Sequence, residues 1–125
     1  MSTALPKTAV AKAAFEAYVN DDRAAIERLI AEDFSFTSPL DNGIGRETYF
    51  AHCWPNHETI AAFHFVRAVE TGDEVIVTYE GETYDGRRFR NTEVLTVRDG
   101  AVHAVEVYFG WSLPHEAAPG GFTGP

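Results

Sequence analysis

Cysteine is nearly absent from this chain of 125 residues, in which Cys53 is the only one. A single cysteine cannot close a disulfide within the chain, and a fold without disulfides is typical of a reducing compartment. No apolar run approaches the roughly 20 residues that a membrane-spanning helix needs. The first residues also lack the apolar segment of a secretion signal. From the sequence we therefore expect a cytoplasmic protein.

Basic side chains are also scarce: ten lysines and arginines stand against 19 aspartates and glutamates, which gives a net charge of -9. The resulting field repels phosphate backbones and anionic membrane surfaces, so neither nucleic acid nor a membrane is expected as a partner. Hydrophobic residues make up 45% of the chain, which is too many for a disordered protein. The length suits one domain with one core.

The first half of the chain has the spacing and the stop signals of short helices. Residues 7–19 contain neither glycine nor proline, and their apolar side chains recur at helical spacing after Pro6. Either Asp21 or Asp22 can cap a second helix. The predicted elements are a helix over 7–19, a short helix that includes residues 26–30, a brief strand ending at Pro39, a turn-rich loop over 38–45 and a third helix over 46–54.

The second half changes to the alternating pattern of strands. The predicted strands cover about 60–70, 73–84, 88–98 and 101–111. Their connections are short enough for hairpins, which predicts an antiparallel meander. Residues 1–113 are then one domain, and residues 114–125 form a tail rich in proline and glycine that we expect to be mobile unless it wraps the domain.

The turns decide which side chains face the interior. If Tyr84-Asp85-Gly86 and Arg98-Asp99-Gly100 are three-residue loops with a left-handed glycine, Val77 lies opposite Glu93, and Glu93 opposite Val105. Two-residue turns at both hairpins would instead place Glu93 beside Glu106 and mix polar with apolar side chains on each face. The preferred inner face holds Val75, Val77, Tyr79, Phe89, Asn91, Glu93, Leu95, Val97, His103, Val105, Val107 and Phe109.

In the strand over 60–70 the patterns leave open which side chains point inward. The inward pair is Phe63 with Phe65 or His64 with Val66.

On the outer face opposite charges pair across strands. The same face carries Ile76, Val94, Val102, Ala104 and Tyr108, from which we expect a homodimer that pairs through this surface.

Glu93 is the leading candidate for chemistry, because the inner face surrounds it with apolar side chains. Burial of a carboxyl group favours its neutral form and moves its pKa toward the range useful for proton transfer. Asn91 and Tyr79 lie opposite each other on the same face and are positioned to orient Glu93 or a ligand oxygen. The alternative is that the three residues form a structural hydrogen-bonded group.

The histidines do not predict a metal site. His52, His57 and His64 lie near Cys53, but no pair has the spacing of a helical zinc site. His103 falls on the inner face near a turn, where a structural role is expected. Neither a phosphate-binding loop nor a nucleophile elbow is present. We therefore expect no metal and no cofactor.

The order of these elements, together with three stretches of sequence, resembles the nuclear-transport-factor-2-like superfamily, and within it the SnoaL-like and ketosteroid-isomerase-like branch. The stretches are residues 29–34 (Leu-Ile-Ala-Glu-Asp-Phe), 45–50 (Gly-Arg-Glu-Thr-Tyr-Phe) and 97–102 (Val-Arg-Asp-Gly-Ala-Val) followed by Val107-Tyr-Phe. The resemblance runs from Ala9 to Trp111. It implies a single α+β domain: a cone-shaped, curved antiparallel sheet, or α+β barrel, wrapped around N-terminal helices and enclosing a pocket.

The catalytic residues of that branch carry over only in part. In ketosteroid isomerases a tyrosine on the first helix and an acid on the third long strand hold an oxyanion, and an aspartate after the first strand is the base. The ungapped correspondence places Ala14, Glu93 and Ser38 at these three positions, so one acid remains. Val107 stands where epoxide hydrolases of the limonene type have an essential aspartate.

Several further residues are expected to line the ligand pocket. Asp41, in the loop after the first strand, lies close to the place where related enzymes keep an acid. The expected ligand-binding residues are Asp41, Ser38, Trp54, Phe89, Val107 and Phe109.

Two functions remain open from the sequence. The first is acid–base isomerisation, cyclisation or dehydration of a small apolar carbonyl compound without a cofactor. The second is non-catalytic binding of a small hydrophobic metabolite. In both cases the partner is a small hydrophobic molecule.

Overall fold

Three α-helices and a 3-10 helix precede the long strands in the computed structural model, which describes residues 5–123. Helix α1 spans Lys7–Val19, α2 spans Arg23–Leu29, α3 spans Arg46–His52 and the 3-10 helix η1 spans Trp54–Glu58. Helix α1 starts after Pro6, as predicted, and buries Val10, Ala11, Phe15 and Ala17. Asp22 is the residue that caps α2, because its carboxylate accepts a hydrogen bond from the Ala25 amide at 3.0 Å.

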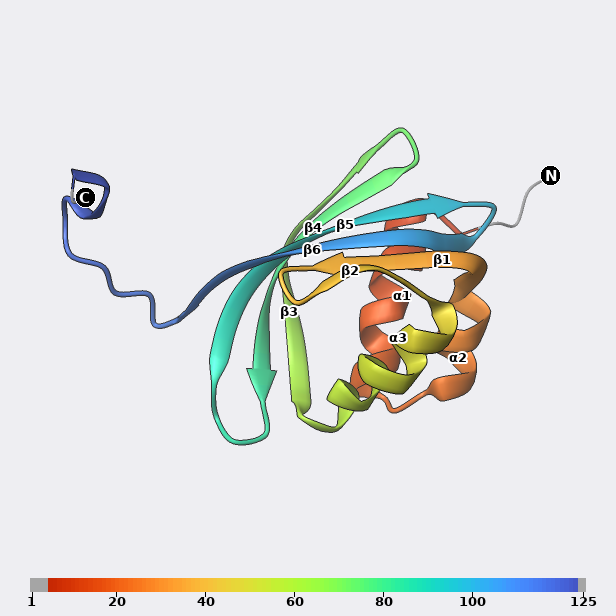
Figure 1. The fold of residues 1–125 in the computed structure, drawn as a ribbon, viewed down its shortest axis with the longest axis horizontal. Helices are drawn as coiled ribbons and strands as arrows, with labels where there is room; N and C mark the ends of the chain where they lie inside the picture. The colour runs from red at the N-terminus through yellow and green to blue at the C-terminus, as the bar shows by residue number, and fades with distance from the viewer. Residues whose placement is uncertain (1–4, 124–125) are drawn as a thin grey trace.

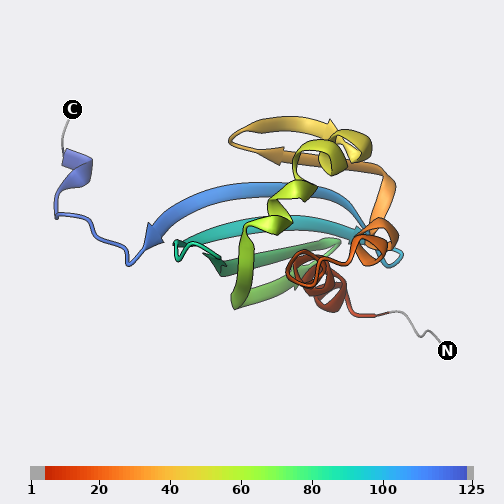
Figure 2. The same cartoon turned by 90° about the horizontal axis from the view of Figure 1, so that it is seen from below.

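Six strands form one strongly curved sheet around these helices (Figure 1). They are β1 Ile30–Ser38, β2 Asp41–Gly45, β3 Ile60–Thr71, β4 Glu74–Thr83, β5 Arg88–Arg98 and β6 Ala101–Leu113, in the spatial order β2-β1-β6-β5-β4-β3. Figure 2 shows α1 and α2 lying on the concave side. The single α+β domain with a curved sheet is therefore confirmed, and the meander from β3 to β6 is antiparallel, as predicted.

Two parts of the sheet differ from the prediction. Strand β1 pairs with β6 in parallel, so the sheet is mixed. Residues 41–45, predicted as part of a loop, form β2 against β1, with Phe36 opposite Ile44. The Gly43 amide donates to Thr37 Oγ1 at 3.0 Å, and Gly43 has a φ of +61° that suits glycine. Pairing with a neighbouring strand here overrides the turn-forming composition of the segment.

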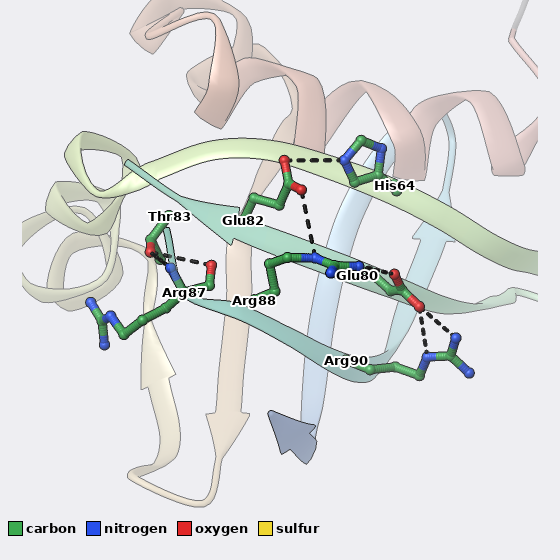
Figure 3. Close-up of polar contacts among 7 residues, drawn as sticks. All are labelled: His64, Glu80, Glu82, Thr83, Arg87, Arg88 and Arg90. Atoms are coloured by element: carbon green, nitrogen blue, oxygen red, sulfur yellow. Dashed lines mark hydrogen bonds and ion pairs between the residues drawn. The ribbon is translucent and has the colours of Figure 1, made fainter. Parts of the chain in front are cut away.

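The β4–β5 hairpin has the predicted register, with Val77 opposite Glu93. Its loop is Tyr84-Asp85-Gly86, and Gly86 has a φ of +88°. On the outer face Glu80 and Glu82 form ion pairs with Arg90 and Arg88 (Figure 3). The hydrogen bond from Arg90, together with nearby positive charge, lowers the pKa of Glu80. Such exposed pairs contribute little to stability, but they agree with the register.

The β5–β6 hairpin corrects the prediction. Its turn has two residues, Asp99 and Gly100, both with positive φ, instead of three. Val97 then lies opposite Val102, and the register shifts at His103 so that Glu93 faces Val107 and not Val105. The extra residue is a β-bulge. It restores the alternation beyond it, so the predicted inner face is retained from Leu95 to Asn91.

The same bulge corrects two assignments near the turn. Val102, predicted on the outer face, is 1% exposed and belongs to the core. His103, predicted on the inner face, occupies the bulge and bonds through Nδ1 to the exposed Asp33 carboxylate at 2.7 Å. Both changes follow from a turn that is one residue shorter than predicted.

Strand β3 turns Phe63 and Phe65 inward, which settles the parity left open by the sequence. Both rings pack edge-on against Phe15 of α1, at centroid distances of 5.1 and 5.4 Å. His64 and Val66 are exposed. The aromatic cluster holds the first helix against the edge of the sheet.

Residues 114–123 leave the domain where β6 ends and run away from it (Figures 1 and 2). The only helix in this segment is a short 3-10 turn at Gly121–Thr123. The Trp111 ring stacks on His115 at 4.4 Å. None of the helices in the described part of the chain has the length and apolar character needed to span a bilayer.

Gly110 is expected to be the least replaceable glycine of the sheet. A Cβ atom at this position would lie 2.0 Å from the backbone carbonyl oxygen of Arg90, whereas a Cβ at Gly45 would meet nothing within 4 Å. We predict that Gly110→Ala lowers the free energy of unfolding by about 1–3 kcal/mol, while Gly45→Ala changes it little. Urea unfolding of both variants measures this. Equal stability of the two would show that the strands can separate at no cost.

The homodimer remains a prediction, now with a smaller apolar surface because Val102 is buried. Ile76 and Val94 are half-buried on the outer face, and Tyr108 is 54% exposed. We expect light scattering to give a dimer mass at roughly 50 µM protein. Tyr108→Asp should yield monomers, whereas Tyr84→Asp at the exposed tip of the β4–β5 hairpin should not. A wild-type monomer at this concentration would contradict the prediction.

Candidate functional site

A cavity of about 230 Å³ lies between the concave face of the sheet and the helices. Most of its wall is apolar, and the lining includes Phe34, Phe36, Phe63, Phe89, Leu95 and Val105. The lining residues Ile26 and Leu95 are fully buried, whereas Leu40 is 79% exposed and Phe109 is 52% exposed. The cavity therefore opens where β1 and β6 end and is closed at the opposite end.

Three polar residues of adjacent strands meet on its wall. Tyr79 of β4 donates from its hydroxyl to Glu93 Oε2 of β5 at 2.6 Å. The Asn91 amide lies 3.4 Å from the same hydroxyl through Nδ2, and its Oδ1 accepts from the Gly110 backbone amide at 3.1 Å. The Gly110 bond fixes the orientation of the Asn91 amide, because only the oxygen can accept it. All three predicted residues thus lie together in the cavity.

Burial raises the pKa of Glu93 from an ordinary carboxyl value to about 7, although the hydrogen bond from Tyr79 acts in the opposite direction. Both charge states of Glu93 are therefore populated near neutral pH. Burial and the charge of Glu93 raise the pKa of Tyr79 far above its usual range, so Tyr79 stays a neutral donor.

A second polar group, formed by Tyr18 and Tyr49, was not predicted. Tyr18 of α1 and Tyr49 of α3 both line the cavity, and their hydroxyl groups are hydrogen-bonded to each other. Burial raises the pKa of both, and the negative charge of Glu93 adds to the effect. One of the two hydroxyls accepts from the other, so its own proton remains available to a ligand.

Neither tyrosine is among the site residues expected from the sequence. Tyr18 completes the apolar face of the first helix, and Tyr49 lies among the aromatic residues of the third. The available signal was a phenol at the end of an otherwise apolar helix face, since a buried tyrosine hydroxyl usually needs a partner.

Two of the predicted polar residues lie at the mouth of the cavity. Ser38 and Asp41 both line it. Ser38 Oγ accepts from the Leu40 amide at 3.0 Å and donates to Asp41 Oδ2 at 3.4 Å. Burial, with a smaller contribution from the Asp41 charge, raises the pKa of Cys53 to about 11. Cys53 is therefore a neutral thiol and a poor nucleophile.

Of the four other residues predicted to line the cavity, three do so and one does not. Phe89, Val107 and Phe109 line the cavity. Trp54 does not: it is buried behind Tyr18, with its ring 4.9 Å from the Tyr18 ring and 4.6 Å from that of His57. It begins the 3-10 helix after α3, which directs it away from the cavity.

The Phe89 ring has room because the residue opposite it is a glycine. It faces Gly81 on β4, and a Cβ atom at Gly81 would lie 2.3 Å from the tip of the Phe89 ring. The ring therefore lies across the glycine. Any side chain at position 81 would move it.

The histidines are dispersed. His57 pairs with Asp21 and His64 with Glu82, each at 3.4 Å. Across residues 5–123 no three side chains of the types His, Cys, Asp and Glu come together in a way that would hold a metal ion.

Comparison with known proteins agrees with this architecture. The family model of the SnoaL-like domain matches residues 11–105. No curated protein sequence matches the chain.

Three solved structures share the fold at low sequence identity. A proposed ketosteroid isomerase from Kribbella flavida is 21% identical, with a TM-score of 0.73 over 91% of this chain and 83% of that one. An LEH-like epoxide hydrolase from M. tuberculosis is 16% identical, with a TM-score of 0.71 over 83% of this chain and 82% of that one. A proposed polyketide cyclase from Sinorhizobium meliloti is 18% identical, with a TM-score of 0.66 over 82% of this chain and 94% of that one.

The family model covers most of the chain, and the curved sheet wrapped around N-terminal helices agrees with the folds of these structures, so this protein belongs to the SnoaL-like domain family.

Proposed function

We propose that this protein catalyses a proton transfer without a cofactor on a small, largely apolar carbonyl compound, in an isomerisation, cyclisation or dehydration. The observation that carries the proposal is Glu93, a single carboxyl group inside an apolar cavity with a pKa of about 7. A group that is half protonated near neutral pH can both take and return a proton.

Each polar group has a role in the proposed reaction. Ionised Glu93 removes a proton from the carbon next to the carbonyl, and the electron pair moves onto the carbonyl oxygen. The free O–H of the Tyr18–Tyr49 pair donates to that oxygen as its charge develops. Glu93 then returns the proton at another position, which completes an isomerisation. Tyr79 and Asn91 hold the carboxyl group in place, and the apolar walls exclude water.

The helix-one tyrosine supports this assignment. Resemblance placed Ala14 at the position of the oxyanion-holding tyrosine in ketosteroid isomerases. Ala14 and Tyr18 both line the cavity, and Tyr18 lies one turn further along the same helix. In the proposed reaction Tyr18, together with Tyr49, takes the place of the donor that the correspondence lacks. Val107 contributes only an apolar side chain where the epoxide hydrolases have their aspartate, which argues against epoxide hydrolysis.

The alternative is a binding protein for a small hydrophobic metabolite. It is favoured by the scarcity of acids in the cavity. Among the described residues only Glu93 and Asp41 bring carboxyl groups to the lining, and Asp41 lies at the mouth, so one acid remains inside. In that case the polar groups only orient a ligand.

Hydrogen exchange separates the two functions. In D₂O, nuclear magnetic resonance follows the loss of the protons next to the carbonyl of 2-tetralone, a two-ring ketone. We expect wild-type protein to accelerate this exchange and Glu93→Gln to be slower by about 10²- to 10⁴-fold, the usual contribution of a general base.

Glu58→Gln, a change of an exposed glutamate outside the cavity lining, is the matched control and should exchange like wild type. Equal rates for Glu93→Gln and wild type would remove Glu93 from the mechanism. A raised melting temperature with 2-tetralone but no faster exchange would support the binding protein.

The stability of the protein should depend on pH through Glu93. Between about pH 4.5 and pH 7 the folded state keeps the Glu93 proton while the unfolded chain releases it, because burial raises the pKa to about 7. The contribution of this proton to the free energy of unfolding is thus fully present below the pKa that Glu93 has in the unfolded chain. It is lost as the pH rises to 7. The loss amounts to about 3 kcal/mol.

Glu93→Gln removes this dependence, so its stability relative to wild type should rise by about 2–3 kcal/mol between pH 5 and pH 8. Tyr79→Phe should strengthen the dependence. It removes the hydrogen bond that favours ionised Glu93, so the pKa of Glu93 rises further and the loss of stability extends to higher pH. Urea unfolding at a series of pH values measures both. Parallel profiles for wild type and Glu93→Gln would show that Glu93 ionises without penalty.

A further inference from the structure

The cavity has hydrogen-bonding groups at two separate places on its wall. Thr37 of β1 pairs with Glu106 of β6, so Ser38 lies level with Val107, and Val107 lies opposite Glu93 of β5. Ser38 and Glu93 are therefore separated by two strand spacings, or about 10 Å along the sheet. The apolar side chain of Val107 lies between them and lines the cavity.

The inner place offers hydrogen-bond donors. One O–H of the Tyr18–Tyr49 pair is free, and the Asn91 amide has a second N–H besides the one directed at Tyr79. The matching ligand group is an oxygen that accepts hydrogen bonds, such as a ketone. It is the same oxygen that the proposed function requires, and the present inference rests on that function for its identity.

The outer place offers an acceptor. Ser38 Oγ already accepts from the Leu40 amide and directs its own proton at Asp41, which leaves the Asp41 carboxylate to accept from a ligand. No lysine or arginine within residues 5–123 forms an ion pair with Asp41, whose side chain lies at the mouth. The matching ligand group is a hydrogen-bond donor, which in the neutral carbonyl compound of the proposed function is a hydroxyl. A carboxylate or phosphate would be repelled by Asp41 and by the net charge of -9.

The volume sets the size of the ligand. A cavity of about 230 Å³ has the volume of roughly eight molecules of liquid water at about 30 Å³ each. At the packing density of a protein interior this corresponds to about a dozen non-hydrogen atoms. One ring or two fused rings fit. A four-ring compound with about 20 such atoms is larger than this volume and would have to extend out through the mouth.

From these three observations we infer that the protein binds a neutral compound of one or two rings that carries a carbonyl group at its inner end and a hydroxyl group at its outer end. The hydroxyl is held by Asp41 with Ser38 behind it. Asp41 is thus a specificity-determining residue for the outer group.

Calorimetric titration with three probes tests the inference. The probes are 6-hydroxy-2-tetralone, which has both oxygens, 2-tetralone, which lacks the hydroxyl, and testosterone, which has a ketone and a hydroxyl on four rings. We expect the hydroxyl to tighten binding of the tetralone to wild-type protein by about 10- to 100-fold, as for a hydrogen bond to a charged group. Testosterone should bind more weakly than either tetralone.

Variants locate the effect. In Asp41→Ala the two tetralones should bind with equal affinity. Ser38→Ala keeps the carboxylate and should lose only part of the preference, which covers the case in which Asp41→Ala disturbs the β1–β2 turn. Asn42→Ala, a change of an exposed neighbour outside the lining, should keep the full preference.

Equal affinity of wild type for the two tetralones would overturn the inference, as would tighter binding of testosterone or a preference that survives in Asp41→Ala. Failure of all three probes to bind wild type would overturn it as well. The exchange experiment on 2-tetralone is independent of these results. A hydroxyl preference without exchange leaves the inference standing and removes the proposed catalysis, whereas exchange without a hydroxyl preference does the reverse.

Discussion

The alternation of side chains along β5 and β6 is the constraint on which the whole site depends. A two-residue turn by itself would place Glu93 opposite Glu106, so both acids would point to the same face of the sheet. One additional residue at His103 shifts the register and returns Glu93 to a position opposite Val107. The position of Val107 beside the carboxyl group and the level of Ser38 on β1 relative to it both follow from that bulge.

A carboxyl group in such surroundings is tolerated because polar neighbours stabilise its ionised form. Tyr79 donates to it directly, Asn91 is anchored by the Gly110 backbone, and the Tyr18–Tyr49 pair faces the same space. None of these neighbours is a cation, so the ionised form is not trapped as it would be in an ion pair. The fold therefore keeps Glu93 between two protonation states at the expense of stability, a compromise typical of functional sites.

Local patterns were sufficient for α1, for the β4–β5 register and for the group of Tyr79, Asn91 and Glu93, because hydrophobic spacing and turn residues act over short distances. They failed where a local pairing or helix start overrode the composition of the segment, and where the deciding contact was remote in sequence. Residues 41–45 became a strand through pairing with β1, and Trp54 was turned from the cavity by the start of a 3-10 helix. The Tyr18–Tyr49 bond joins two residues that are 31 positions apart on different helices, which no local pattern encodes.

The contact between Gly81 and Phe89 separates the control of cavity size from the surface that a ligand touches. Gly81 is not part of the lining, yet the Phe89 ring occupies the space that a side chain at position 81 would fill. The size of the cavity can therefore change through the neighbouring strand, while every polar group on the cavity wall stays in place. In protein engineering, a substitution at Gly81 would alter the shape of the cavity without replacing any residue that lines it.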